Sequence, residues 1–345
     1  MRLKSKPSDF IVEEINTLQF DKEGKYSYYK LKKTNLETQS AIQKISDIWK
    51  LNEKYINTAG TKDKVAITTQ FISISQGPEK DIETENLELK YLGKGRERLN
   101  LGSLEGNKFI ITVRDITEKE KKNFEENTKG DKSNLQFMNY YDDQRFGIKK
   151  DNHVIGKLFI KKQFKEAARL FITREHYPYT KAKKYLETHL NDYIGTLRIL
   201  PRKLLLMFVH AYQSWLWNET AKIFLEKKLK NVKTIEYSAG TLYFPTQKEN
   251  LILENIDIPI IGFDIEERDE EVNTILADIM KKENVTERDF LIKQMPEITA
   301  AGGRRNLLMD CNDFTAKEID KETVELSFTL GKGSYATMVV KQLFS

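Results

Sequence analysis

One short turn of this sequence carries side chains that could do acid–base or nucleophilic chemistry. Residues 57–64 read NTAGTKDK and place Asp63 between two lysines. An ionised carboxylate can act as a nucleophile or as a general base, and a nearby ammonium favours its charged form. Taken alone, an aspartate in such a turn is usually a solvated turn residue. The turn therefore supplies a candidate without identifying a reaction.

The patterns of several other chemistries are missing from the sequence. The four histidines are scattered, and the single Cys311 cannot complete a zinc site at the usual ligand spacing. GKGR at 93–96 lacks the third glycine of a dinucleotide-binding loop, and GKGS at 331–334 breaks the order of a phosphate-binding loop. No GxSxG segment is present. These gaps argue against a metal site, a nicotinamide or flavin cofactor and a Rossmann-type methyltransferase, and leave acid, base and aromatic chemistry.

The charge pattern is compatible with nucleic-acid binding but does not prove it. Lys and Arg number 57 against 52 Asp and Glu, which gives a net charge of +5 and a pI near 8.8. Phosphates attract cations and bases stack on aromatic rings, although a lysine-rich helix face is often simply solvated. The lysines cluster, with Tyr and Phe interleaved, at residues 30–33, 149–150, 161–165, 181–184 and 227–233.

Length and composition predict a cytoplasmic protein of two domains. The chain has 345 residues, of which 39% are hydrophobic and 32% charged, as in folded globular proteins. A single cysteine fits a reducing compartment. No apolar stretch approaches the roughly 20 residues that span a bilayer, and no apolar signal region follows the basic N-terminus. We therefore expect no membrane partner, and nothing in the sequence indicates an obligate protein partner.

Secondary-structure elements must position this turn, and their expected order is strands in the first and last parts of the chain and helices in the middle. Alternating Tyr26, Tyr28 and Lys30 predict a strand, and residues 324–330 alternate in the same way. Residues 38–51 predict a helix with Thr38 as its N-cap. Further helices are expected at residues 164–171, 179–190, 202–230 and 336–344. This order predicts one α+β domain interrupted by an insertion.

Three segments, in order along the chain, resemble motifs of the TruD family of tRNA pseudouridine synthases. They are AGTKDKVAITTQ at 59–70, NYYDDQRFG at 139–147 and GKGSYATMVV at 331–340. Supporting similarity lies in PSDFIVEE at 7–14, LGSLEGN at 101–107 and HAYQSWLWN at 210–218. The resemblance covers residues 2–344.

The resemblance implies a fold and an activity. It implies a pseudouridine-synthase catalytic domain, an antiparallel sheet flanked by helices, built from residues 1–154 and 301–345, with a mainly helical family-specific domain inserted at 155–300. It implies conversion of uridine to pseudouridine at position 13 of the tRNA D-arm. This reaction neither oxidises nor hydrolyses, so it implies no cofactor and no metal.

The resemblance also assigns residues to roles. Asp63 is the expected catalytic carboxylate, and whether it attacks the sugar or removes a ribose proton stays open. Lys4 is its expected charge partner, with the adjacent Lys62 as a second choice. Residues expected to bind the base are Asn139, Tyr141 and Phe10. Residues expected to contact the RNA backbone are Arg145, Arg304, Arg305 and Lys332.

The sequence departs from the family pattern in two places, and two other functions stay open. Tyr141 and Asp142 stand where the family has Phe and Gly, and Lys341-Gln342 stands where it has Arg-Glu. One alternative is an RNA-binding or RNA-chaperone protein with a vestigial aspartate. The other is a different RNA-modifying enzyme such as a methyltransferase, which the missing glycine-rich loop disfavours.

Overall fold

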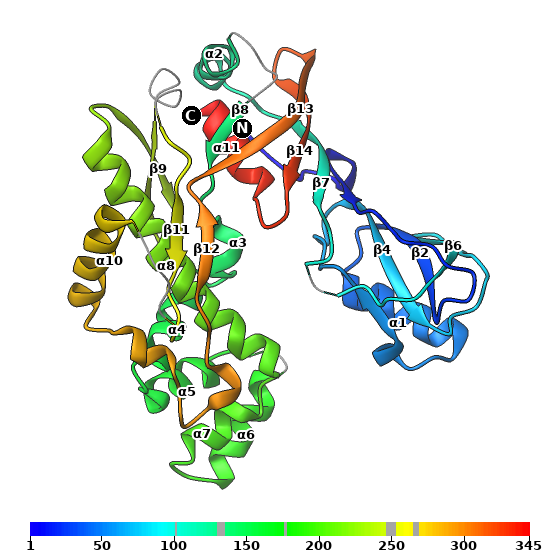
Figure 1. Ribbon diagram of the computed structural model, residues 1–345, viewed down its shortest axis with the longest axis horizontal. Helices are drawn as coiled ribbons and strands as arrows, with labels where there is room; N and C mark the ends of the chain where they lie inside the picture. Colours follow the sequence, from blue (N-terminus) through cyan, green and yellow to red (C-terminus); the bar gives the residue numbers. More distant parts are fainter. Residues whose placement is uncertain (101, 130–134, 176–177, 246–252, 265–268) are drawn as a thin grey trace. The chain divides into compact units, whose positions relative to one another are not determined.

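The computed structural model describes residues 1–345 except 101, 130–134, 176–177, 246–252 and 265–268 (Figure 1). It divides into two compact units, the first formed by Met1–Phe137 and Met309–Ser345 and the second by Met138–Leu308. Both ends of the chain therefore belong to the first unit. The insertion expected at 155–300 falls within the second unit, whose bounds lie 17 residues earlier (155 against 138) and 8 residues later (300 against 308).

A large mixed sheet dominates the first unit. Its strands follow the order β5-β6-β2-β4-β1-β7-β14-β13-β8, and β3 pairs with β4. Their bounds are β1 Phe10–Ile15, β2 Tyr26–Thr34, β3 Ile56–Thr58, β4 Ile67–Ser75, β5 Ile82–Thr84, β6 Leu87–Gly95, β7 Gly106–Val113, β8 Leu135–Met138, β13 Leu308–Asp320 and β14 Thr323–Gly331. The α+β class is as expected, but β1 pairs with β4 in parallel. That pairing is possible because β2 and α1 intervene in the chain and return it to the same direction.

Helix α1 (Thr38–Trp49) covers one face of the β2–β4–β6 region (Figure 1). Its apolar positions Ile42 and Ile45 pack with Tyr29 and Leu31 of β2 in one buried cluster. The helix ends at Lys50, whose left-handed backbone closes it. The structure makes Thr38 the first residue of the helix and Glu37 the cap, so the expected N-cap is wrong by one residue.

Two further helices complete the first unit. Helix α2 (Glu118–Asn127) begins with a capping box in which Thr117 and Glu120 satisfy each other's backbone N–H groups. Helix α11 (Ala336–Phe344) packs on it through stacked rings of Phe124 and Phe344, whose centroids lie 4.8 Å apart. The C-terminal helix has the bounds expected from the sequence.

The second unit is built around the long helix α8 (Arg202–Lys228), which packs against α4, α10, β10 and β11 (Figure 1). Gly156 of α4 permits close packing, since an added Cβ would lie 2.0 Å from the Phe208 carbonyl oxygen. The other elements are α3 Asp143–Phe146, α4 Asn152–Ile160, α5 Phe164–Ile172, α6 Tyr179–Thr188, α7 Tyr193–Arg198, β9 Val232–Tyr237, β10 Gly240–Pro245, β11 Asp257–Ile260, α10 Glu270–Glu283 and β12 Gly303–Asn306. Within the described ranges, no helix has the length and apolarity to cross a membrane.

Candidate active site

The turn that carries Asp63 is held by buried polar side chains from the sheet and from α1. The Thr38 hydroxyl accepts a hydrogen bond from the backbone N–H of Lys62 at 3.0 Å. The Gln70 side chain, fully buried in β4, donates to the carbonyl of Gly60 at 3.2 Å. A loop whose backbone groups are bonded in this way has few alternative conformations. The turn is therefore a fixed platform between β3 and β4.

Asp63 forms an ion pair with Lys4 in the first unit. The Lys4 Nζ donates to Asp63 Oδ2 at 2.8 Å, and the two side chains are 26% and 24% exposed. The same ammonium lies 4.1 Å from the centroid of the Phe10 ring. Phe10 is 2% exposed and packs edge-to-face on Phe109, so here its ring supports Lys4. The pair places a carboxylate and a cation at the surface of the unit, both accessible to water.

The segment that carries Lys4 is tied down at both sides. The backbones of Arg2 and Arg114 bond each other in both directions, at 2.6 and 3.0 Å. The guanidinium of Arg114 also donates to both oxygens of the buried Asp9, at 3.0 and 2.8 Å. These bonds hold the pKa of Asp9 below its usual value. Between the two anchors, Lys4 has a left-handed backbone with φ of 54°.

Lys62 pairs with the carboxylate of Glu14 and not with that of Asp63, its expected partner. Its Nζ lies 3.2 Å from Glu14 Oε2 and donates to Asn107 Oδ1 at 2.5 Å. The lysine side chain is 8% exposed and that of Glu14 is 0% exposed. This buried ion pair ties the turn to β1 and β7. Lys4, rather than Lys62, supplies the cation that the structure shows on Asp63.

A second cluster of expected site residues lies in the second unit. The Arg305 guanidinium donates to the Asn139 carbonyl at 2.8 Å and to Asn139 Oδ1 at 2.5 Å. It also lies 4.2 Å from the centroid of the Tyr141 ring. Asn218 of α8 bonds both the N–H and the carbonyl of Tyr141, each at 2.9 Å. Tyr141 is only 5% exposed, so a base could stack on its ring only after the ring is uncovered.

The other expected backbone-contacting residues differ in their surroundings. Arg145 is half-buried in α3, with its guanidinium 5.1 Å from the Tyr141 ring centroid. Arg304 is exposed on β12, in register with Pro259 of β11. Lys332 is exposed in the turn after β14 and donates to the Gly102 carbonyl at 3.3 Å. Of these, Arg304 and Lys332 have the exposure that a phosphate contact needs.

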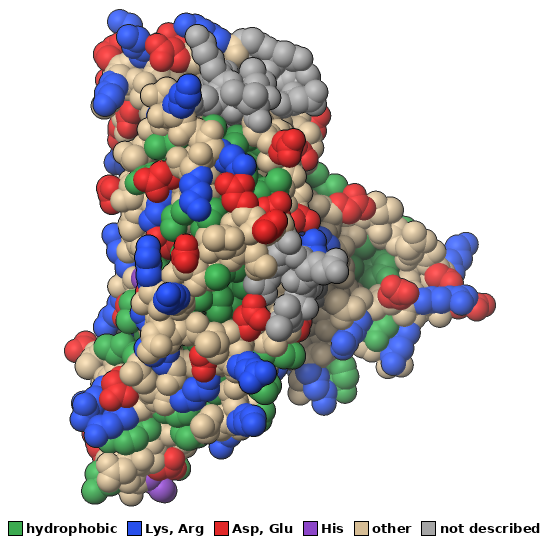
Figure 2. Space-filling model, turned by 60° about the vertical axis from the view of Figure 1, so that its left-hand side comes forward, with side chains coloured by type: hydrophobic (Ala, Val, Ile, Leu, Met, Phe, Trp, Pro, Cys, Tyr) green, Lys and Arg blue, Asp and Glu red, His purple; other side chains and the backbone are tan. Residues whose placement is uncertain are grey.

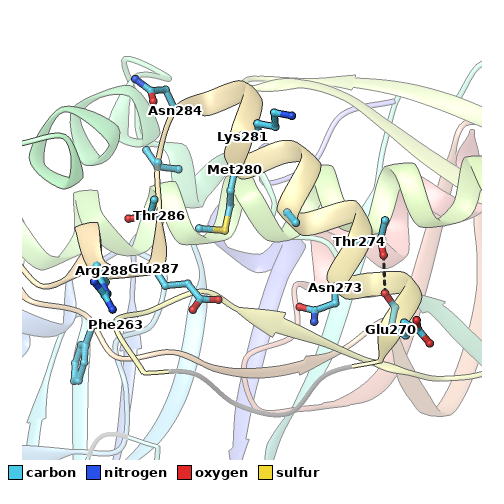
Figure 3. A pocket seen from close by; sticks show the side chains of 12 residues that line it. Phe263, Glu270, Asn273, Thr274, Met280, Lys281, Asn284, Thr286, Glu287 and Arg288 are labelled. Carbon is cyan, nitrogen blue, oxygen red and sulfur yellow. Dashed lines mark hydrogen bonds between the residues drawn. The ribbon is translucent and has the colours of Figure 1, made fainter.

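A large hollow lies elsewhere in the second unit. It has a volume of about 1070 Å³ and is lined mainly by α10 and the residues after it, together with Phe263 (Figure 3). The Thr274 hydroxyl at its edge donates to the Glu270 carbonyl at 3.0 Å (Figure 3). None of the expected site residues lines this hollow. Size alone therefore does not make it the active site.

Neither the face shown in Figure 2 nor a search of the described residues for metal ligands marks another site. On the face shown in Figure 2, Lys and Arg side chains are interspersed with Asp and Glu, so charge alone does not mark an RNA-binding area there. Among the residues that the structure describes, no three His, Cys, Asp or Glu side chains are grouped as metal ligands would be.

Some residues of the site were missed by sequence reasoning. The sequence predicts Thr38 only as a helix cap, and Gln70 and Glu14 stand only within the motifs at 59–70 and 7–14. In the structure all three are buried: Thr38 and Gln70 hydrogen-bond the backbone of the Asp63 turn, and Glu14 forms an ion pair with Lys62 of that turn. Gln70 lies on β4, most of whose residues are buried on both faces of the strand. A polar residue at such a position normally has a specific hydrogen-bonding partner.

The α+β fold places a lysine-paired aspartate on a fixed turn of a mixed sheet, where a carboxylate could act as a nucleophile or as a general base. Comparison with known proteins identifies the family. The model of the tRNA pseudouridine synthase D (TruD) family matches residues 1–190 and 179–343. The chain belongs to this family.

Individual relatives agree over the whole length. The tRNA pseudouridine synthase D of Aquifex aeolicus is 30% identical over 382 residues, which span 100% of this chain and 98% of the relative. A Methanocaldococcus jannaschii protein named "Probable tRNA pseudouridine synthase D 2" is 33% identical, over 100% of this chain and 92% of its own. A Methanosarcina mazei crystal structure carrying the name TruD is 29% identical and superposes with a TM-score of 0.67, covering 99% of this chain and 93% of that one.

Proposed function

We propose that this protein converts uridine to pseudouridine at position 13 of the tRNA D-arm, with Asp63 as the catalytic carboxylate and without a cofactor. The family supports tRNA pseudouridine synthesis as the activity. The observation that carries the assignment of Asp63 is its 2.8 Å contact with Lys4 on a turn fixed by buried side chains. The position in tRNA rests on the resemblance of the three motifs.

The reaction exchanges one sugar–base bond for another. The C1′–N1 bond breaks, the uracil rotates, and a C1′–C5 bond forms. The hydrogen at C5 leaves as a proton, and N1 takes up a proton. The atoms and electrons balance within the nucleotide and water, so the step requires only groups that stabilise charge and move protons.

Asp63 is suited to the first part of this reaction. As an ionised group it can attack C1′ or remove a ribose proton, and both routes need a carboxylate held at a fixed place. The Lys4 ammonium donates to Oδ2 of Asp63 and so fixes the orientation of that oxygen. Because both side chains are about a quarter exposed, a nucleotide can approach without unfolding the turn.

Binding of the uracil requires that the target nucleotide leave its stack, which costs a few kcal/mol. Stacking on an aromatic ring returns about 1–3 kcal/mol per base. We propose Tyr141 for this role, with Asn139 bonding the base edge. Since Arg305 contacts both residues, it would have to withdraw from them, and its guanidinium would then be available to a phosphate.

The test uses tRNA labelled with tritium at C5 of uridine, because formation of the C1′–C5 bond releases that hydrogen to water. Purified protein and a tRNA transcript are incubated without any added cofactor, and the modified positions are mapped. We expect tritium release and pseudouridine at position 13 for the wild type. A transcript with cytidine at position 13 should release no tritium.

The Asp63→Asn variant separates the enzyme from the binding protein. We expect it to bind the tRNA with unchanged affinity and to form no pseudouridine. Conversion by the Asn variant at the wild-type rate would remove Asp63 from the mechanism. Binding without conversion by the wild type would instead favour an RNA-binding protein.

A further inference from the structure

Lys33 is a lysine whose surroundings are unusual for its residue type. It lies in the central strand β2 and is 0% exposed. Lysines are almost never fully buried unless their ammonium is paired or fully hydrogen-bonded. No motif singled out Lys33, and the proposed reaction as described above does not use it. Its burial therefore needs a separate explanation.

The partners of Lys33 are backbone carbonyls rather than a carboxylate. Its Nζ donates to the carbonyl of Asp63 at 2.8 Å and to that of Leu36 at 2.7 Å, and a longer contact of 3.4 Å reaches the carbonyl of Lys62. An ammonium has three N–H donors, so these three acceptors saturate it. Two of the three acceptors belong to the turn that carries the proposed catalytic carboxylate.

Stability alone does not account for this lysine. Burial lowers the pKa of Lys33 to about 8, although the charge of Asp63 acts to raise it and that of Lys62 to lower it further. The folded-state pKa is thus below the unfolded-state value near 10.5. Below about pH 8 the group is protonated in both states, and its charge then makes folding less favourable. At neutral pH the charged Lys33 therefore lowers the stability of the fold, even though all three of its N–H donors are hydrogen-bonded.

We propose that Lys33 is a positioning residue for the reaction, whose ammonium fixes the backbone of Asp63 so that the carboxylate faces the substrate. Lys33 donates to the backbone carbonyl of Asp63, and Lys4 donates to its carboxylate. Two lysines therefore fix Asp63, one through its backbone and one through its side chain. This inference rests on the proposed function, since it assumes that the Asp63 carboxylate takes part in the reaction. Misplacement of a reacting group by about 1 Å can cost on the order of 100-fold in rate.

The sharpest test replaces only the charged end of the side chain. Lys33→Cys in a Cys311→Ala background has one thiol, because Cys311 is the only cysteine of the chain. The unfolded protein is alkylated with 2-bromoethylamine, which restores an ammonium at the original length, or with 1-iodopropane, which places a methyl group there. Both products are then refolded, and their circular dichroism spectra and unfolding midpoints are compared.

Two independent measurements follow on these two products. We expect pseudouridine formation in a single turnover to be about 10- to 100-fold slower with the propyl group, with tRNA affinity within twofold. We also expect faster amide hydrogen exchange in residues 59–66 of the propyl form. Equal rates, or equal exchange, in the two products would overturn the proposal.

A matched control uses a lysine that also bonds a backbone carbonyl. Lys162 of the second unit donates to the carbonyl of Asp289 at 3.0 Å and to its carboxylate at 2.7 Å. The same two alkylations at position 162 should give equal rates. A second variant, Lys33→Gln, avoids refolding: it keeps donors without the charge, and a wild-type rate in a folded Gln variant would equally contradict the role.

Failure of this inference is distinguishable from failure of the proposed function. If Asp63→Asn remains active, the function assigned to Asp63 fails whatever the Lys33 products show. If Asp63→Asn is inactive and both Lys33 products react at the same rate, only the role of Lys33 fails. The exchange measurement requires no catalysis and reports on the turn in either case.

Discussion

Replacing Lys4 by methionine tests the charge partner of the proposed catalytic aspartate. Methionine is an unbranched apolar side chain, and it removes the ammonium that donates to Asp63 at 2.8 Å and lies 4.1 Å from the centroid of the Phe10 ring. The hydrogen bond that orients the carboxylate is then lost. We expect a lower rate of the chemical step with little change in tRNA affinity.

The size of the effect follows from the geometry. A hydrogen bond between charged groups contributes about 1.5–3 kcal/mol. Lys4 and Asp63 are 26% and 24% exposed, so water screens the pair and the lower part of that range, about 1.5–2 kcal/mol, applies. Each 1.36 kcal/mol corresponds to a factor of ten in rate, which gives a decrease of about 10- to 30-fold.

The assay is tritium release in a single turnover at saturating protein, so that the chemical step and not product release is measured. Lys6→Met, two residues along and exposed, is the control for loss of one positive charge from the same segment. Lys4→Arg should restore only part of the rate, because a planar guanidinium does not occupy the place of a compact ammonium.

A Lys4→Met rate within twofold of the wild type would refute this reasoning. So would an equal decrease for Lys6→Met, since the effect would then come from general attraction of RNA. An unfolding midpoint of Lys4→Met well below that of the wild type would point to loss of structure rather than of catalysis.

Two further predictions concern the parts that support the site. Asp9→Asn removes the charge that accepts both Arg114 bonds, so we expect the protein to lose about 2–3 kcal/mol of stability at pH 7 in urea unfolding. Because the pKa of Asp9 is lowered in the fold, the Asp9 carboxylate stabilises the protein above its unfolded-state pKa of 3.8, and this stabilisation is lost as the pH falls through the folded-state pKa. The free energy of unfolding of the Asn variant should not show this decrease at acid pH. Asn218→Leu removes the two hydrogen bonds that Asn218 makes to the backbone N–H and carbonyl of Tyr141, so we expect about 1–3 kcal/mol of destabilisation, and a urea midpoint equal to that of the wild type would contradict it.

The sequence by itself determined the elements that depend on local pattern. Alternation predicted β2 and β14, helical spacing predicted α1 and α8, and the C-terminal helix was placed at its observed bounds. Local patterns are readable because side chains repeat every two residues on a strand and every 3.6 on a helix. The three motifs predicted the family in the same way, since they are short stretches of adjacent residues.

Tertiary structure alone decided the partners of the charged residues. Lys4 and Lys62 were both expected beside Asp63, and nothing local in the sequence shows that Lys62 reaches Glu14 while Lys4 crosses 59 residues to bond the aspartate. Tyr141 likewise looked like an open stacking ring, whereas Arg305, 164 residues further on, lies over it. Such contacts depend on which strands become neighbours, and that is set by the packing of the whole sheet.

Lys33 shows where the two kinds of information meet. The strand was predicted from the alternation of Tyr26, Tyr28 and Lys30, and the structure shows that Lys33 falls in the other phase, with the buried Tyr29 and Leu31. The pattern could not say what satisfies its ammonium. Only the fold brings the carbonyls of residues 36, 62 and 63 together around it. These carbonyls lie in loops, and the orientation of a loop carbonyl is fixed only when the strands on either side of the loop are paired.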